Sequence, residues 1–175
     1  HCACDARPES LTCTEREDAL DGCNAVLDIR QRTPERPMII NLPVTVAMSM
    51  SHIDANQIED MSDNRKYGDS VVLSLHPHND RGCGVADTEL ALLAGADRVE
   101  GTLFGHGERT GNVDIITLAM NMHTHGVDPH LDFADLPALV ELHERWTRLH
   151  VYDRPPLPGT LVLPTFPGRP PAAPP

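Results

Sequence analysis

The stretch "SVVLSLHPHND", residues 70–80, joins an apolar run to a group of polar side chains. The run carries no charge before His76, which is typical of a strand buried within a parallel sheet. His76 and His78 stand two positions apart, so an extended backbone directs both imidazoles to the same side. Two neutral imidazoles can bind a divalent metal ion when other groups complete the ligand set. A polar loop with two unrelated histidines is the alternative, and the spacing alone does not decide between them.

Strand-like and helix-like segments alternate on both sides of this stretch. Residues 38–42 form another uncharged apolar run, and a third, shorter strand is expected from residue 98. Apolar residues at helical spacing predict helices at residues 13–33, 50–64, 85–97, 113–126 and 132–150. Gly95 is expected to end the third helix, and Asp135 to cap the last. This alternation predicts an α/β fold built on a parallel sheet, although the opening "HCACDA" does not resemble a strand.

Each predicted strand leads into a chemically rich stretch: "PVTVA", "HPHNDRG" and "GHGERTGN". Functional groups at the carboxyl ends of strands are typical of (β/α) barrels and open α/β sheets. Neither GxGxxG nor GxxxxGK[ST] occurs, so the sequence does not support a nucleotide-binding fold of those types.

The glycine-rich stretch "GHGERTGN", residues 105–112, predicts a tight loop that presents Glu108 and Arg109. Asn112 has two interpretations: its amide oxygen can bind a metal ion, or its side chain can cap a helix that begins near Val113. Asn79 and Asp80, which follow the two histidines, are candidates for acceptors that orient the imidazole rings.

Composition narrows the possible partners. The chain has 175 residues and a net charge of −12, which argues against nucleic acid or an anionic membrane as partner. No apolar run has the length of a membrane span. Five cysteines, an odd number without a regular spacing, favour reduced thiols and a cytoplasmic location. Residues 154–175 are rich in proline, and we expect this tail to be disordered.

The order of the motifs closely resembles the 2-isopropylmalate synthase family, which belongs to the metal-dependent TIM-barrel Claisen-condensing enzymes. The residues that carry the resemblance are "PES" (8–10), "TPERPMIINLPVTV" (33–46), "VVLSLHPHNDRG" (71–82), "LAGADRVEGTLFGHGERTGN" (93–112) and "LAMNMHTHGVDP" (118–129). The resemblance implies condensation of acetyl-CoA with 2-oxoisovalerate in leucine biosynthesis, a divalent metal (Zn, Mg or Mn) and a homodimer. It also implies roles for single residues: a catalytic carboxylate at Glu9, a hydroxyl for the oxoacid carboxylate at Thr45, and metal ligands at His76, His78 and Asn112.

The resemblance covers only part of the family's barrel. Residues 1–153 correspond roughly to strands five to eight of a (β/α)8 TIM barrel, so we expect a partial barrel. The first strand, which supplies a metal-binding aspartate in the family, has no counterpart, and Ala47 and His106 depart from the family's glutamate and asparagine. We therefore expect this chain to be inactive alone. The alternatives are a sister synthase, for citramalate or homocitrate, and a non-catalytic metal-binding fragment.

Overall fold

The computed structural model describes residues 5–6, 11–29, 33–46 and 48–159. The chain divides into two compact units, residues 1–118 and residues 119–175. Within the described ranges, no helix has the length and apolar character needed to cross a membrane.

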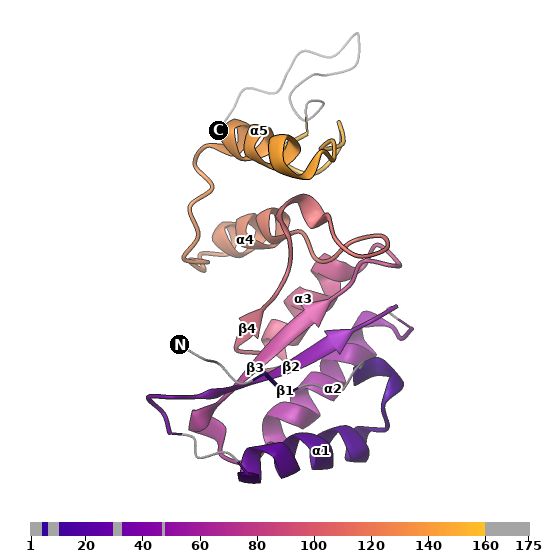
Figure 1. The fold of residues 1–175 in the computed structure, drawn as a ribbon, viewed down its shortest axis with the longest axis vertical. Coiled ribbons are helices and arrows are strands. Elements are labelled where there is room, and N and C mark those ends of the chain that lie inside the picture. Colours follow the sequence, from indigo (N-terminus) through magenta and orange to yellow (C-terminus); the bar gives the residue numbers. More distant parts are fainter. Residues whose placement is uncertain (1–4, 7–10, 30–32, 47, 160–175) are drawn as a thin grey trace. The chain divides into compact units, whose positions relative to one another are not determined.

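The first unit is built on four parallel strands in the order β1-β2-β3-β4. They are β1 (Asp5–Ala6), β2 (Met38–Val44), β3 (Val71–Pro77) and β4 (Arg98–Val99), and Figure 1 shows β2 and β3 side by side. The predicted parallel α/β arrangement is confirmed. The expectation that residues 1–6 contain no strand is wrong for Asp5–Ala6, which pairs with Ile39 and Ile40. A two-residue edge strand depends on backbone pairing, which a sequence pattern does not reveal.

All five predicted helices are present, and α1 to α3 alternate with the strands in the chain. Their bounds are α1 (Arg16–Ile29), α2 (Ser51–Asn64), α3 (Gly84–Leu93), α4 (Ile115–Thr124) and α5 (Leu136–Thr147). Short 3-10 turns lie at Leu11–Cys13, Gly68–Ser70 and Leu103–Gly105. Gly95 follows the end of α3 with φ +102°, as expected of a glycine that ends a helix.

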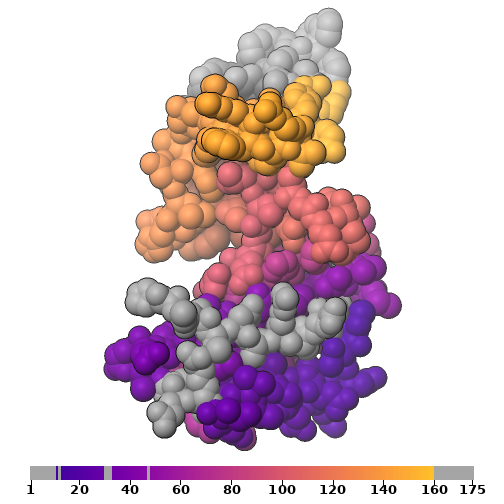
Figure 2. Space-filling view, in the orientation of Figure 1, coloured from indigo at the N-terminus to yellow at the C-terminus, as the bar shows by residue number. Residues whose placement is uncertain are grey.

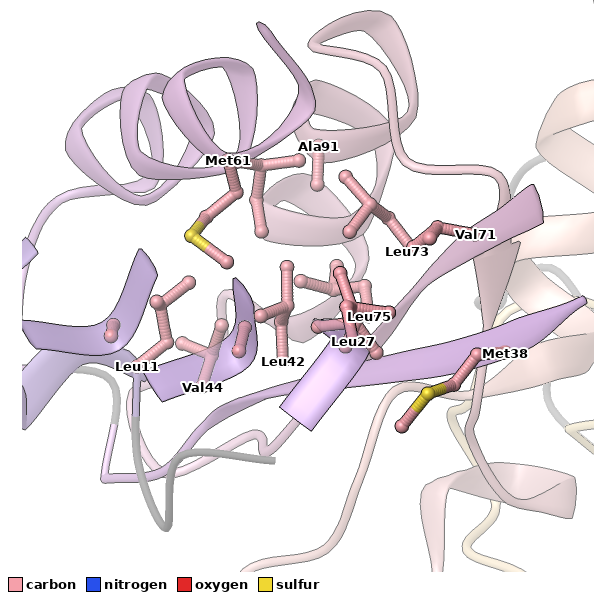
Figure 3. Close-up of a cluster of buried hydrophobic side chains, with 14 residues drawn as sticks. Leu11, Leu27, Met38, Leu42, Val44, Met61, Val71, Leu73, Leu75 and Ala91 are labelled. Carbon is pink, nitrogen blue, oxygen red and sulfur yellow. The ribbon is translucent and has the colours of Figure 1, made fainter. Parts of the chain in front are cut away.

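The core of the first unit lies between one face of the sheet and helices α1, α2 and α3. The register pairs Ile40 with Leu73 and Leu42 with Leu75, so alternate residues of both strands share this face. Figure 3 shows Leu42 and Leu73 in the same cluster as Met61 of α2 and Ala91 of α3. The fully buried members include Leu27, Met38, Ile40, Leu42, Ile58, Leu73 and Leu75.

Helix α1 is amphipathic and lies at the surface of its unit, where its indigo atoms are visible in Figure 2. Leu27 packs into the core, whereas Ile29 is exposed. Cys23 also faces the core, and burial raises the pKa of its thiol to about 11. Cys13, Cys23 and Cys83, the three cysteines within the described ranges, are free thiols.

The opposite face of the same strands carries polar side chains. Asn41 of β2 and Ser74 of β3 are paired in the register, and both are buried. Buried polar groups require hydrogen-bond partners. Both of these side chains donate to Glu100, which directly follows β4. This face of the sheet leads to the candidate site.

The second unit contains α5 and its capping contacts. The Asp135 carboxylate accepts a hydrogen bond from the backbone N of Ala138 at 3.0 Å, as predicted for an N-cap. In the predicted tail, residues 154–159 form a turn in which the Gly159 N donates to the Pro155 O at 3.2 Å. Residues 160–175 of that tail lie outside the described residues.

Candidate metal centre

The carboxyl end of β3 brings two histidines together. The backbone N of His78 donates to the Val44 O at 3.1 Å, so pairing with β2 continues one residue beyond β3. This keeps the backbone extended and directs both imidazoles to the same side. The ring centroids of His76 and His78 are 5.3 Å apart, with an angle of 41° between the ring planes.

Asn112 reaches the same place from the glycine-rich loop. The backbone N of Val113 donates to the Pro77 O at 3.2 Å, which draws the end of this loop against the end of β3. The Asn112 amide nitrogen lies 3.3 Å from His76 Nε2 and 3.4 Å from His78 Nδ1. The side chains of all three residues therefore meet at one point.

Asn112 does not cap the helix that follows it, so that alternative interpretation is wrong. Helix α4 begins at Ile115, and the Asp114 carboxylate accepts from the Ile116 N at 3.0 Å and from the Thr117 hydroxyl at 2.6 Å. Asp114 performs the capping because its carboxylate reaches the free N–H groups of the first turn. The Asn112 side chain is left to face the two histidines.

Two glycines make this close approach of the loop possible. A Cβ atom at Gly107 would lie 2.0 Å from Asn112 Oδ1, so a side chain there would displace the amide. Gly111 has φ +108°, and a Cβ atom there would lie 1.9 Å from the Gly105 carbonyl oxygen. The loop therefore depends on glycine at both positions.

The hydrogen bonds of the Asn79 and Asp80 side chains go to groups other than the histidine rings. Asn79 Oδ1 accepts from the backbone N of Gly84 at 2.9 Å, at the start of α3. Asp80 accepts two hydrogen bonds from Arg109, at 2.8 Å from Nε and 2.9 Å from Nη2. Asn79 therefore binds the N-terminus of α3, and Asp80 forms a bidentate pair with the Arg109 guanidinium. Glu108 contacts the same guanidinium, at 2.9 Å from Nη1.

Charged side chains of the glycine-rich loop shift the pKa values of Asp80 and His78. The hydrogen bonds and charge of Arg109 hold the pKa of Asp80 below its usual range. Burial lowers the pKa of His78, and the positive charge of Arg109 lowers it further. His78 therefore favours the neutral imidazole, the form that binds metal ions.

Glu100 is a residue of this site that the sequence reasoning missed. Its Oε2 lies 3.0 Å from His76 Nδ1 and accepts from Asn41 Nδ2 at 2.8 Å, while its Oε1 accepts from the Ser74 hydroxyl at 2.9 Å. Burial raises the pKa of Glu100, but the hydrogen bonds from these three side chains and the positive charge of Arg98 together lower the pKa overall. The sequence offered one signal for Glu100, which is its position at the end of a predicted strand. The carboxyl ends of parallel strands gather at one edge of the sheet, so a residue there can reach the site.

Two predicted site residues remain, Thr45 and Glu9. Thr45 directly follows Val44, so it lies at the same edge of the sheet as His78 and is half-buried. Glu9 lies outside the described residues. Within the described ranges, no group of three or more His, Cys, Asp or Glu side chains could hold a metal ion. The donors gathered here are thus two imidazoles and one amide.

A separate surface pocket of about 600 Å³ lies in the second unit, lined by residues between Ala119 and Ala134. None of the predicted site residues lines it. The volume of this pocket is not evidence of function, so the polar groups at the end of β3 remain the candidate functional site.

Comparisons with known proteins give a consistent family. The sequence model of the HMGL-like family matches residues 3–142. The 2-isopropylmalate synthase of Helicobacter hepaticus is 61% identical over 161 residues, which cover 92% of this chain and 29% of that protein. The enzymes of the same name from Desulfitobacterium hafniense and Brucella suis are 60% and 53% identical over the same share of this chain. The chain thus spans about 29% of the length of these relatives.

Solved structures share the fold. An HMG-CoA lyase from Bacillus subtilis superposes with a TM-score of 0.65 at 15% identity, covering 81% of this chain and 46% of that one. An HMG-CoA lyase from Acinetobacter baumannii, solved with coenzyme A and 3-methylmalate, gives a TM-score of 0.58 at 20% identity, covering 77% and 43%. The fold is therefore part of a (β/α)8 TIM barrel, as the sequence predicted.

Proposed function

The chain belongs to the HMGL-like family, and we propose that residues 1–153 form the second half of a 2-isopropylmalate synthase catalytic barrel. The observation that carries this proposal is the meeting of His76, His78 and Asn112 at the carboxyl end of β3. In (β/α) barrels that end of the strands carries the active site. The identity to synthases from several bacteria supports the same assignment.

The whole enzyme would be a transferase that condenses acetyl-CoA with 2-oxoisovalerate to form 2-isopropylmalate, in leucine biosynthesis and as a homodimer. A bound divalent metal would supply Lewis-acid polarisation of the oxoacid ketone. The Thr45 hydroxyl, at the same edge of the sheet, would donate to the oxoacid carboxylate. Glu9 would act as the catalytic carboxylate. The coenzyme A bound to the Acinetobacter lyase supports a CoA ester as one substrate.

The donors present fit a divalent metal as part of a ligand set. His76 Nε2 and His78 Nδ1 both face the Asn112 amide nitrogen, so each presents a ring nitrogen to the same point. Rotation of the Asn112 amide by half a turn would present its oxygen there instead, and an amide oxygen is a metal ligand. Among Zn, Mg and Mn, two imidazole nitrogens suit Zn best.

The donor set also supports the proposal that this chain alone binds metal without turnover. Two imidazoles and one amide fall short of the usual four ligands of zinc unless water or another group completes the set. We therefore propose a metal-binding half-site in the isolated chain. The catalytic activity would belong to the complete enzyme.

Metal titration of the purified chain tests this proposal. We expect His76→Ala and His78→Ala each to weaken Zn²⁺ affinity at least about tenfold in isothermal titration calorimetry, because each removes a ligand. His123→Ala is the matched control, since His123 is exposed on α4. A parallel Mn²⁺ titration guards against binding by cysteine thiolates, which prefer softer metals.

Unchanged affinity in both histidine variants would overturn the site assignment. Release of CoA by the isolated chain, assayed with acetyl-CoA, 2-oxoisovalerate and Zn²⁺, Mg²⁺ or Mn²⁺, would overturn the proposal that this chain is inactive alone.

A further inference from the structure

Glu100 contacts two strands of the sheet, β2 and β3, through its carboxylate. It follows β4, and its own backbone N donates to the Leu75 O of β3 at 2.8 Å. We propose that Glu100 is a positioning residue that fixes the His76 imidazole with Nε2 facing His78 and Asn112. The inference rests on the proposed function, because it gives that orientation a purpose in metal binding.

The contacts of His76 define its tautomer. A carboxylate oxygen only accepts hydrogen bonds, so the 3.0 Å contact between Glu100 Oε2 and His76 Nδ1 places the proton on Nδ1. In a neutral imidazole, Nε2 then carries the free electron pair. That nitrogen is the one that lies 3.3 Å from the Asn112 amide. The opposite tautomer would put a hydrogen atom where the electron pair is needed.

The carboxylate is held firmly enough to impose this orientation. Asn41 of β2 donates to the oxygen that contacts His76, and Ser74 of β3 donates to the other oxygen. Asn41 is 2% exposed and Ser74 is 0% exposed, so both donors are fixed by packing. Since neighbouring strands engage both oxygens, rotation of the carboxylate would break at least one of these bonds. Metal-binding histidines commonly depend on such a carboxylate at the second ring nitrogen.

The two histidines are oriented by different means. Within the described ranges, His78 has no carboxylate at hydrogen-bond distance, and its backbone is tied to Val44 and Asn112. Glu100 acts on His76 alone. Removal of the carboxylate should therefore alter one histidine and leave the other unchanged, which a general loss of structure would not do.

The test reads the tautomers directly and then the affinity. In two-bond ¹H–¹⁵N spectra of the metal-free chain at pH 8, with His76 assigned by a His76→Gln variant, we expect the His76 proton on Nδ1. In Glu100→Gln we expect a mixture of tautomers at His76 and an unchanged His78 signal. Zn²⁺ affinity should fall about 10- to 100-fold, with part of the loss recovered in Glu100→Asp.

Glu144→Gln is the matched control, because Glu144 of α5 also accepts a hydrogen bond from a histidine, His150, at 2.7 Å from Nδ1. We expect it to leave Zn²⁺ affinity unchanged. A folded Glu100→Gln with unchanged tautomers and affinity would overturn the positioning role. If that variant does not fold, the unaltered chain decides: a proton on Nε2 of His76 overturns the proposal.

The same measurements separate this inference from the proposed function. An Nδ1 proton on His76 in a chain that binds no metal would leave the orientation standing and would refute the metal site. Metal binding with the Nε2 tautomer in the free chain would retain the proposed function and refute the role of Glu100.

Discussion

The two faces of β2 and β3 differ in what they contain, although the same strands form both. On the helix-covered face, Leu42 and Leu73 lie in an apolar cluster with residues from three helices. On the other face, Asn41 and Ser74 are equally inaccessible to solvent but are joined to Glu100 by hydrogen bonds. Burial is therefore not what separates core from site in this sheet. Apolar packing stabilises the helix-covered face. On the other face, buried polar side chains are placed so that they donate hydrogen bonds to the Glu100 carboxylate.

The first way to test this contrast is to make a cavity on the apolar face. Leu73→Ala removes a fully buried side chain, and we expect the free energy of unfolding to fall by about 2–5 kcal/mol. Urea unfolding followed by circular dichroism measures this change. Val72→Ala is the control, because the neighbouring Val72 is only half-buried and points to the other face. Equal losses in both variants would contradict the assignment of the faces.

The second test removes one donor from the polar face. Ser74→Ala deletes the 2.9 Å hydrogen bond to Glu100, and we expect a loss of about 1–3 kcal/mol, typical of a bond to a charged group. Because the folded-state pKa of Glu100 is lowered from its usual 4.5, the ionised network stabilises the fold above that pH and less as pH falls. Unfolding measured from pH 7 down to pH 3 should show the two proteins converging, and a difference independent of pH would contradict this account.

The third test concerns a charge on the helix-covered side. Asp54 of α2 is buried, and burial raises its pKa; the hydrogen bond from Ser49 opposes this rise and the nearby Asp87 adds to it. The folded state thus holds the proton more tightly, so stability falls as pH rises above the usual value of 3.8. We expect Asp54→Asn to gain stability relative to the unaltered chain as the pH rises from 4 to 8, measured by thermal unfolding. A relative loss over that interval would show that the buried charge is compensated.

Local patterns predicted the elements of this fold well. The uncharged run at residues 38–42 became β2, which extends two residues further to Val44. Asp135 caps α5 as its residue type and position indicate, because a cap depends on residues that are neighbours in sequence. The edge strand Asp5–Ala6 escaped prediction because its partner lies more than thirty residues away.

The site was predictable only in part, because some of its contacts join residues that are far apart in the sequence. The spacing of His76 and His78 is local, and the structure brings them together with Asn112. The partner of His76 is not local, because Glu100 reaches it only through the pairing of β3 with β4. Asn79 stands beside the histidines in sequence, but its side chain accepts a hydrogen bond from Gly84, the first residue of α3. Proximity in sequence therefore pointed to Asn79 and Asp80, whereas the carboxylate that contacts His76 comes from the register of β3 and β4.

The pairing of Asn41 with Ser74 also predicts how these strands respond to changes in length. Side chains alternate between faces, so deleting one residue at the start of β2 would send the leucine positions toward Glu100 and the asparagine into the apolar cluster. Deleting two residues would preserve the alternation and only shorten the strand. Insertions or deletions of an even number of residues inside β2 and β3 should therefore be tolerated, whereas those of an odd number should destabilise the fold.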